Sequence, residues 1–107
     1  MELEGLQKEA HRIAVEHGWW NAPRPVLELL MLIVTEVAEA AEDYRNGTMA
    51  EVIMPDGKPT GLASELADII IRVADLAEQY NINLADAVTR KMEYNATRPY
   101  RHGGKRA

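Results

Sequence analysis

The sequence predicts an all-α fold in a single domain that covers residues 1–107. Apolar residues recur at helical spacing in four segments, and glycine or proline residues separate these segments. Strand signals are weak throughout the chain. A length of 107 residues supports one domain with a modest core and leaves little room for a second one.

The four helices are expected at about residues 2–17, 26–46, 62–80 and 84–95. Gly18 and Gly47 should end the first and the second helix, because glycine readily adopts the left-handed conformation that follows a helix. Asn83 is expected to cap the fourth helix, with Asp86 at its third position. These signals are local and predict helix ends independently of the packing.

Two connectors interrupt the helices. Residues 19–25 contain two prolines, which cannot sit inside a helix, so this segment is expected to join the first helix to the second. Residues 48–61 contain the turn sequence Pro-Asp-Gly-Lys-Pro, so we expect a loop or a small hairpin there.

Composition excludes several classes of protein. The chain has no cysteine, so disulfides and thiolate zinc sites are excluded. No apolar run approaches the roughly 20 residues that cross a bilayer, and the charged N-terminal segment is unlike a signal peptide. A cytoplasmic location without a membrane partner is therefore expected. The net charge of −5 argues against binding long nucleic acid, although a basic tail is expected from about residue 98.

Two acidic pairs lie on the two longest predicted helices. Glu36 and Glu39 border the apolar stripe of the second helix, and Glu65 and Asp68 border that of the third. Packing of the two stripes should bring the pairs together, at a cost from charge repulsion that a divalent cation would remove. Oxygen ligands suit Mg²⁺, with Mn²⁺ as an alternative. The other interpretation is ordinary solvated surface charge.

The predicted fourth helix carries two polar residues on its apolar stripe. Lys91 and Asn95 share that face with Leu84, Val88 and Met92. Inward-facing polar groups need partners, because an unpaired buried amide costs roughly 2–7 kcal/mol. Lys91 could pair with one of the glutamates, or both residues could face a cavity that holds phosphate oxygens.

These elements resemble the signature of the MazG-like nucleoside triphosphate pyrophosphohydrolases. That signature is E-x-x-E at Glu36–Glu39, E-x-x-D at Glu65–Asp68, and then a Lys-x-x-x-Asn-x-x-Arg spacing. The third element is Lys91, Asn95 and Arg98, followed by Arg101, His102 and Gly103. The resemblance covers about residues 11–105. It implies a four-helix domain that assembles into helical-bundle dimers or tetramers.

The resemblance also implies an activity, the Mg²⁺-dependent conversion of a nucleoside triphosphate to monophosphate and pyrophosphate, and a role in nucleotide-pool house-cleaning. All-α dUTP hydrolases and phosphoribosyl-ATP pyrophosphohydrolases are similar more distantly, and fold-level likeness does not choose among the substrates. Two rival functions remain open, a nucleotide sensor without turnover and an interaction protein that a metal stabilises.

The resemblance assigns roles to the candidate site residues. The four carboxylates would hold the metal, with one of them as a candidate base for the attacking water. Lys91, Asn95 and Arg98 would hold phosphates, and Arg101 would either do the same or belong to a solvated tail. Trp19 and Trp20 would seal the small core, or one of them would stack on the nucleobase. Asp75 is expected at the surface or in a supporting contact, and Arg72 is expected to pair with nearby acids.

Overall fold

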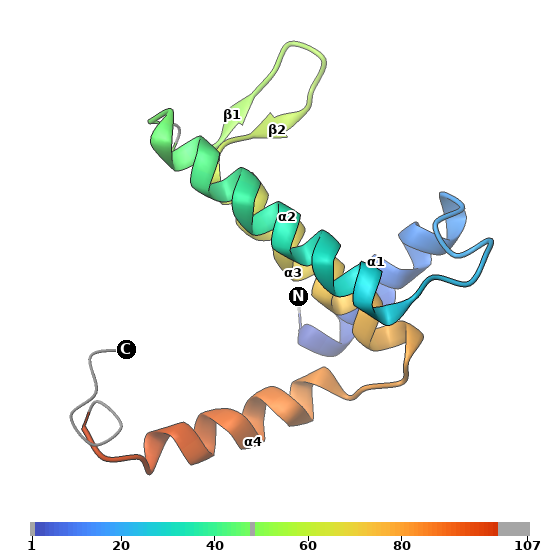
Figure 1. The fold of residues 1–107 in the computed structure, drawn as a ribbon, viewed down its shortest axis with the longest axis vertical. Coiled ribbons are helices and arrows are strands. Elements are labelled where there is room, and N and C mark those ends of the chain that lie inside the picture. Colours follow the sequence, from blue (N-terminus) through green and yellow to red (C-terminus); the bar gives the residue numbers. More distant parts are fainter. Residues whose placement is uncertain (1, 48, 101–107) are drawn as a thin grey trace.

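The computed structural model describes residues 2–47 and 49–100, which form four helices and one two-stranded hairpin (Figure 1). The all-α prediction is confirmed, because the two strands have only two residues each. The predicted helix ends lie within one residue of the observed ones. In chain order the elements are α1 (Leu3–Glu16), α2 (Val26–Arg45), β1 (Val52–Ile53), β2 (Pro59–Thr60), α3 (Leu62–Gln79) and α4 (Leu84–Ala96).

The local signals for helix ends act as expected. Gly18 and Gly47 have φ angles of 82° and 79° just beyond the ends of α1 and α2, in the left-handed region where a side chain would be strained. Asn83 precedes α4, and its side-chain oxygen accepts a hydrogen bond of 3.1 Å from the backbone N–H of Asp86. Both kinds of cap satisfy backbone groups that a helix end leaves without partners.

The segment between α2 and α3 is the small hairpin, the second of the two forms expected for residues 48–61. β1 and β2 are antiparallel, with Val52 opposite Thr60 and Ile53 opposite Pro59. The hairpin reverses the chain, so that α3 runs back alongside α2 (Figure 1). This pairing brings the second and third predicted helices together along their length.

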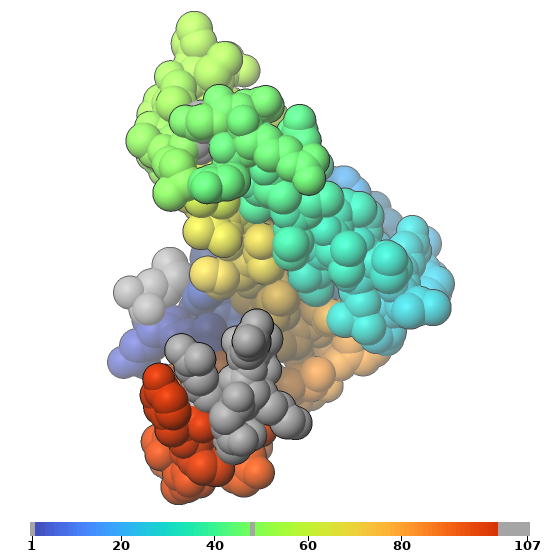
Figure 2. Space-filling view, turned by 60° about the vertical axis from the view of Figure 1, so that its left-hand side comes forward, coloured from blue at the N-terminus to red at the C-terminus, as the bar shows by residue number. Residues whose placement is uncertain are grey.

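α3 is the central helix of the structure. It packs against α1 on one side and α2 on the other, whereas the main contact of α4 is with α1. The hairpin and α4 consequently lie at opposite ends of the molecule (Figure 2). A site formed by α2 and α3 is therefore separated from most of α4 within one chain.

The core of the single chain is small and consists mainly of alanine. Its buried apolar residues are Ala10, Leu29, Ala40, Ala74 and Ala77. We expected the apolar stripes of α2 and α3 to be buried, but Leu30, Val37 and Leu66 stay about half exposed. The reason is geometric, because α2 has a partner helix on one side only. Among the described residues, no helix is long and apolar enough to span a membrane.

Candidate functional site

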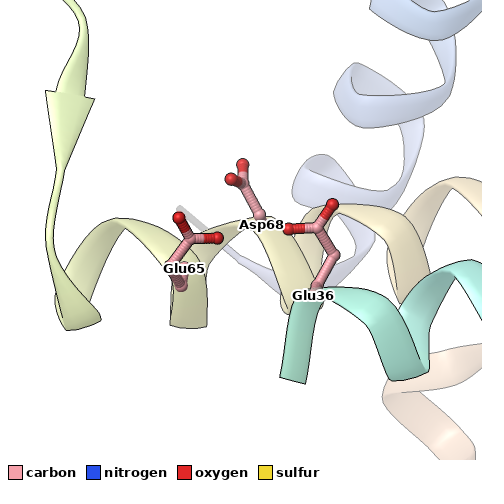
Figure 3. A group of neighbouring side chains, drawn as sticks. All are labelled: Glu36, Glu65 and Asp68. Atoms are coloured by element: carbon pink, nitrogen blue, oxygen red, sulfur yellow. The ribbon is translucent and has the colours of Figure 1, made fainter. Parts of the chain in front are cut away.

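Three of the four predicted carboxylates meet at the seam between α2 and α3. Glu36 from α2 and Glu65 and Asp68 from α3 each offer one carboxylate oxygen, and these oxygens lie within 4.8 Å of one another. Figure 3 shows the three side chains on the same side of the two helices. The i, i+3 spacing on α3 explains this placement, since residues three apart are neighbours on one helix face. We call these three residues the carboxylate cluster.

Glu39, the fourth predicted carboxylate, lies at the edge of this cluster. Its side chain is exposed, and it acts on Glu65 through charge and a hydrogen bond. Burial contributes most to raising the pKa of Glu65 to about 7, and the charges of Glu39, Asp43 and Asp68 raise it further. Both burial and neighbouring negative charge therefore disfavour the ionised form of this carboxyl group.

The pKa of Asp68 is also raised. Burial contributes most, and the charge of Glu36 adds to it, while Arg72 and Lys58 act in the opposite direction. The nearby cations therefore offset only part of the repulsion within the cluster.

Two oxygens of the cluster are buried without a partner. Oε2 of Glu36 and Oε2 of Glu65 have no hydrogen-bond donor among the described residues. The other oxygen of Glu36, Oε1, accepts a hydrogen bond of 2.8 Å from Nε of Arg72. The expected pairing of Arg72 with a nearby acid is thus observed. Buried anionic oxygens without donors are costly, and a hard divalent cation bound to them would remove that cost. The residues present therefore fit Mg²⁺ or Mn²⁺.

A polar network supports the site from α1 and the first connector. Nδ1 of His11 lies 2.8 Å from Oδ1 of Asp75, and Nε1 of Trp20 donates to both oxygens of Asp75 at 2.9 and 3.2 Å. The Asp75 side chain is only 15% exposed. Of the two positions expected for it, at the surface or in a supporting contact, the structure shows the supporting contact. Through these bonds Trp20 belongs to the network that supports the site. The sequence reasoning missed His11, although it lies next to the buried Ala10 in α1.

A cleft of about 260 Å³ opens beside the cluster, between α1, the first connector and α3. Glu36 and Asp68 form part of its wall, so the cleft and the cluster are continuous. Trp19 also lines the cleft and is 61% exposed, which leaves much of its indole accessible. Arg24 and Arg72 supply two cations to the same cleft. The arrangement joins a possible metal site to a pocket with an aromatic wall.

The predicted phosphate-binding residues lie elsewhere in the chain. Lys91, Asn95 and Arg98 are all exposed, and α4 has no buried residue. Lys91 and Arg98 flank the ring of Tyr94, at 5.4 and 5.8 Å from its centroid. Within the described ranges, Lys91 makes no ion pair with a glutamate.

The expectation that Lys91 and Asn95 face inward is wrong for the single chain. The reason is that α4 packs mainly on α1 and leaves most of its surface to solvent. Arg101, with His102 and Lys105, lies outside the described residues.

Curated relatives resemble the chain over most of its length. Mouse dCTP pyrophosphatase 1 is 31% identical over 102 residues, and the human and rat proteins of that name are 31% identical over 99 residues. Each match covers 90% of this chain but 58% of the relative, so the chain spans little more than half the length of these proteins. No family model and no solved structure matches. The three relatives confirm the resemblance to the MazG-like nucleoside triphosphate pyrophosphohydrolases.

Proposed function

We propose that this relative of the MazG-like enzymes is a Mg²⁺-dependent nucleoside triphosphate pyrophosphohydrolase. It converts a ribo- or deoxyribonucleoside triphosphate to the monophosphate and pyrophosphate. The observation that carries the proposal is the convergence of Glu36, Glu65 and Asp68 beside a cleft, with two buried oxygens that find no donor in the described part of the chain. Three relatives with the name dCTP pyrophosphatase 1 support the same reaction class.

In this proposal the carboxylate cluster and Glu39 hold the metal. Bound Mg²⁺ supplies positive charge to the phosphate oxygens and lowers the pKa of a bound water. The chain orients these ligands by two means, the packing of α2 on α3 and the hydrogen bond from Arg72 to Glu36. That bond uses Oε1 of Glu36 and leaves Oε2 for the cation.

The cleft takes the nucleoside end of the substrate. The exposed indole of Trp19 provides a surface on which a nucleobase can stack, a contact worth roughly 1–3 kcal/mol. Trp20 supports this wall, because its N–H is already bonded to Asp75. The two expected roles are therefore divided between the tryptophans: Trp19 stacks on the nucleobase, and Trp20 has a structural role.

The chain acts as a homodimer or homotetramer in this proposal. Lys91 and Asn95 lie on α4, whose main contact is with α1, and Arg98 follows the end of this helix, so the three residues are positioned to serve a neighbouring copy. We infer that they bind phosphate at the carboxylate cluster of that neighbour, where cations would stabilise developing negative charge. Arg101 would extend the same surface. A cytoplasmic house-cleaning role on the nucleotide pool fits this activity.

Product analysis tests the reaction. Incubation of the protein with nucleoside triphosphates and Mg²⁺ should yield monophosphate and pyrophosphate on anion-exchange chromatography. Diphosphate and orthophosphate as products would contradict the proposal. Ca²⁺ should support binding better than turnover, because its looser coordination positions water less well.

The same experiment separates the rival functions. A nucleotide sensor would bind the triphosphate without turnover, and a metal-stabilised interaction protein would not bind it. Including dUTP and phosphoribosyl-ATP in the substrate panel tests the two more distant reaction types.

A further inference from the structure

Arg72 is held in a fixed position at the wall of the cleft. Its Nε donates to Oε1 of Glu36 at 2.8 Å, and its side chain is 39% exposed. Among residues 2–47 and 49–100, neither terminal nitrogen of Arg72 donates a hydrogen bond to the protein. A guanidinium anchored through Nε keeps its two terminal amino groups available as a planar pair of donors.

Outside the carboxylate cluster, the described residues that line the cleft offer more hydrogen-bond donors than acceptors. Arg24 adds a second guanidinium, whose Cζ lies 5.7 Å from the Trp19 ring centroid and 5.3 Å from that of Trp20. Among the described lining residues outside the cluster, Asp75 is the one carboxylate, and it already accepts hydrogen bonds from Trp20 and lies within bonding distance of His11. A nucleobase bound beside Trp19 would therefore lie next to guanidinium N–H donors of Arg24 and Arg72 that need acceptors.

We propose that Arg72 is a specificity-determining residue that selects bases with two adjacent hydrogen-bond acceptors. This inference rests on the proposed function, which supplies a nucleotide as the ligand. Guanine offers O6 and N7 to the guanidinium fork, and cytosine offers O2 and N3. Adenine presents an amino donor beside N7, and uracil or thymine presents an N–H donor beside each carbonyl, so each leaves one arm of the fork without a partner.

A substrate comparison tests the selection. We expect kcat/KM for dGTP, dCTP or both to exceed that for dATP and dUTP by about tenfold to hundredfold, the discrimination typical of a bidentate arginine contact. 7-Deaza-dGTP, which lacks the N7 acceptor, identifies the base that Arg72 contacts. A large loss relative to dGTP indicates guanine, and a dCTP preference without such a loss indicates cytosine. Equal turnover of all four bases would overturn the inference.

Arg72→Lys keeps the positive charge beside Glu36 but removes the fork. We expect it to reduce the base preference at least about fivefold, because a lysine makes a point contact and cannot bond two acceptors in a plane. Arg12→Lys is the matched control, since Arg12 lies on the exposed face of α1 and bonds Glu9 and Glu16. Its base preference should equal that of the wild type. Unchanged preference in Arg72→Lys would overturn the inference.

Binding without metal separates this inference from the proposed function. The affinities of the full chain for GMP, CMP, AMP and UMP, measured by calorimetry in EDTA, report base recognition without hydrolysis. Preferred binding of GMP or CMP that Arg72→Lys removes supports the inference, even if no triphosphate is hydrolysed. Hydrolysis of all four triphosphates together with equal monophosphate affinities overturns the inference and leaves the pyrophosphohydrolase proposal intact.

Discussion

At the scale of single residues, the side chains of the candidate metal site lower the stability of the metal-free fold. Glu36, Glu65 and Asp68 hold carboxylate oxygens within 4.8 Å of one another, and two of their oxygens are buried without donors from residues 2–47 and 49–100. Like charges in a partly buried seam repel one another more strongly than in water. Strain of this kind is commonly retained at functional sites.

The first prediction concerns neutral isosteres at this site. Glu39→Gln and Asp68→Asn should each abolish hydrolysis and leave the metal-free protein as stable as the wild type or more stable, because each removes repulsion. Mg²⁺ should stabilise the wild type by about 2.7 kcal/mol at a hundredfold excess over its dissociation constant, if it binds only the folded state. The variants should lose most of that gain. Thermal melts in EDTA measure the stability of the metal-free protein, and their comparison with melts in Mg²⁺ measures the stabilisation by the metal.

Glu42→Gln is the matched control for these variants. Glu42 is exposed on α2, its Oε2 lies 3.9 Å from Nη1 of Arg45, and it does not contribute to the raised pKa of Glu65 or Asp68, so its replacement should preserve turnover and the response to Mg²⁺. If Glu39→Gln and Asp68→Asn melt well below the wild type in EDTA and respond normally to Mg²⁺, these carboxylates are structural and the metal site is disproved.

The second prediction is a pH dependence of stability in EDTA. The pKa of Glu65 is raised from 4.5 to about 7, so the folded state binds this proton more tightly than the unfolded state does. The resulting stabilisation is complete below about pH 4.5 and is lost as the pH rises through about 7. Glu65→Gln should flatten this part of the melting profile. A wild-type profile that rises across the same window would contradict the assignment.

At the scale of secondary-structure elements, the direction of α4 is fixed where it leaves α3. Nε2 of Gln7, a buried residue of α1, donates to the backbone oxygen of Ile82 at 2.7 Å and to Oε1 of Glu78 at 3.1 Å. These bonds tie the α3–α4 turn to α1. Asn81 in that turn has a φ of 54°, in the left-handed region that asparagine tolerates better than most residues. The start of α4 is thus anchored, while its polar face stays exposed.

The third prediction follows from this placement of α4. Lys91→Ala and Asn95→Ala should each lower turnover strongly and leave the helical circular dichroism unchanged, because both side chains are exposed. Arg90→Ala, at the adjacent exposed position, is the control that should keep turnover. Wild-type kinetics in both variants would remove their role in phosphate binding.

Complementation tests whether a neighbouring copy receives these residues. Lys91→Ala and Asp68→Asn chains, each inactive alone, should regain part of the activity after they are unfolded and refolded together. A shared site explains that recovery, since one mixed interface carries an intact cluster and an intact α4. Mixtures that stay inactive, although the two chains co-assemble, would show that each chain serves its own site.

At the scale of the whole molecule, the single chain buries too little apolar surface for its size. Alanine makes up most of the core, and large apolar residues of α2 and α4 stay in solvent, with Leu27 71% and Met92 66% exposed. Contiguous exposed apolar faces of this kind mark protein interfaces. The fourth prediction is therefore a dimer or tetramer by light scattering at micromolar concentration, and a mass of 12.0 kDa, that of one chain, would contradict it.

A charge on the exposed face of α2 sharpens this test. Val34→Glu replaces a residue that is about half exposed in the single chain, so folding of one chain should tolerate it, but an interface would bury the charge. We expect this variant to dissociate and to melt at a lower temperature. Thr35→Glu, at the next exposed position of α2, tests how far the interface extends around the helix.

The sequence by itself determined the helices and the acidic pairs. Apolar periodicity and local caps such as Gly18, Gly47 and Asn83 are properties of short segments, so they predict helix ends to within one residue. The spacing within E-x-x-E and E-x-x-D also fixes that each pair lies on one face of its helix. The position of Arg72 one turn beyond Asp68 also predicts a pairing with a nearby acid, although its partner Glu36 lies on the other helix.

Only the tertiary structure decided which side chains meet. A helical wheel gives the face of a residue but not the neighbour that covers this face, so it could not separate the clustered Glu36 from the exposed Glu39. It could not join His11 to Asp75, which are 64 residues apart in the chain. The helical wheel also placed Lys91 on an inward face. An apolar stripe has the same sequence pattern whether its own chain or another copy buries it.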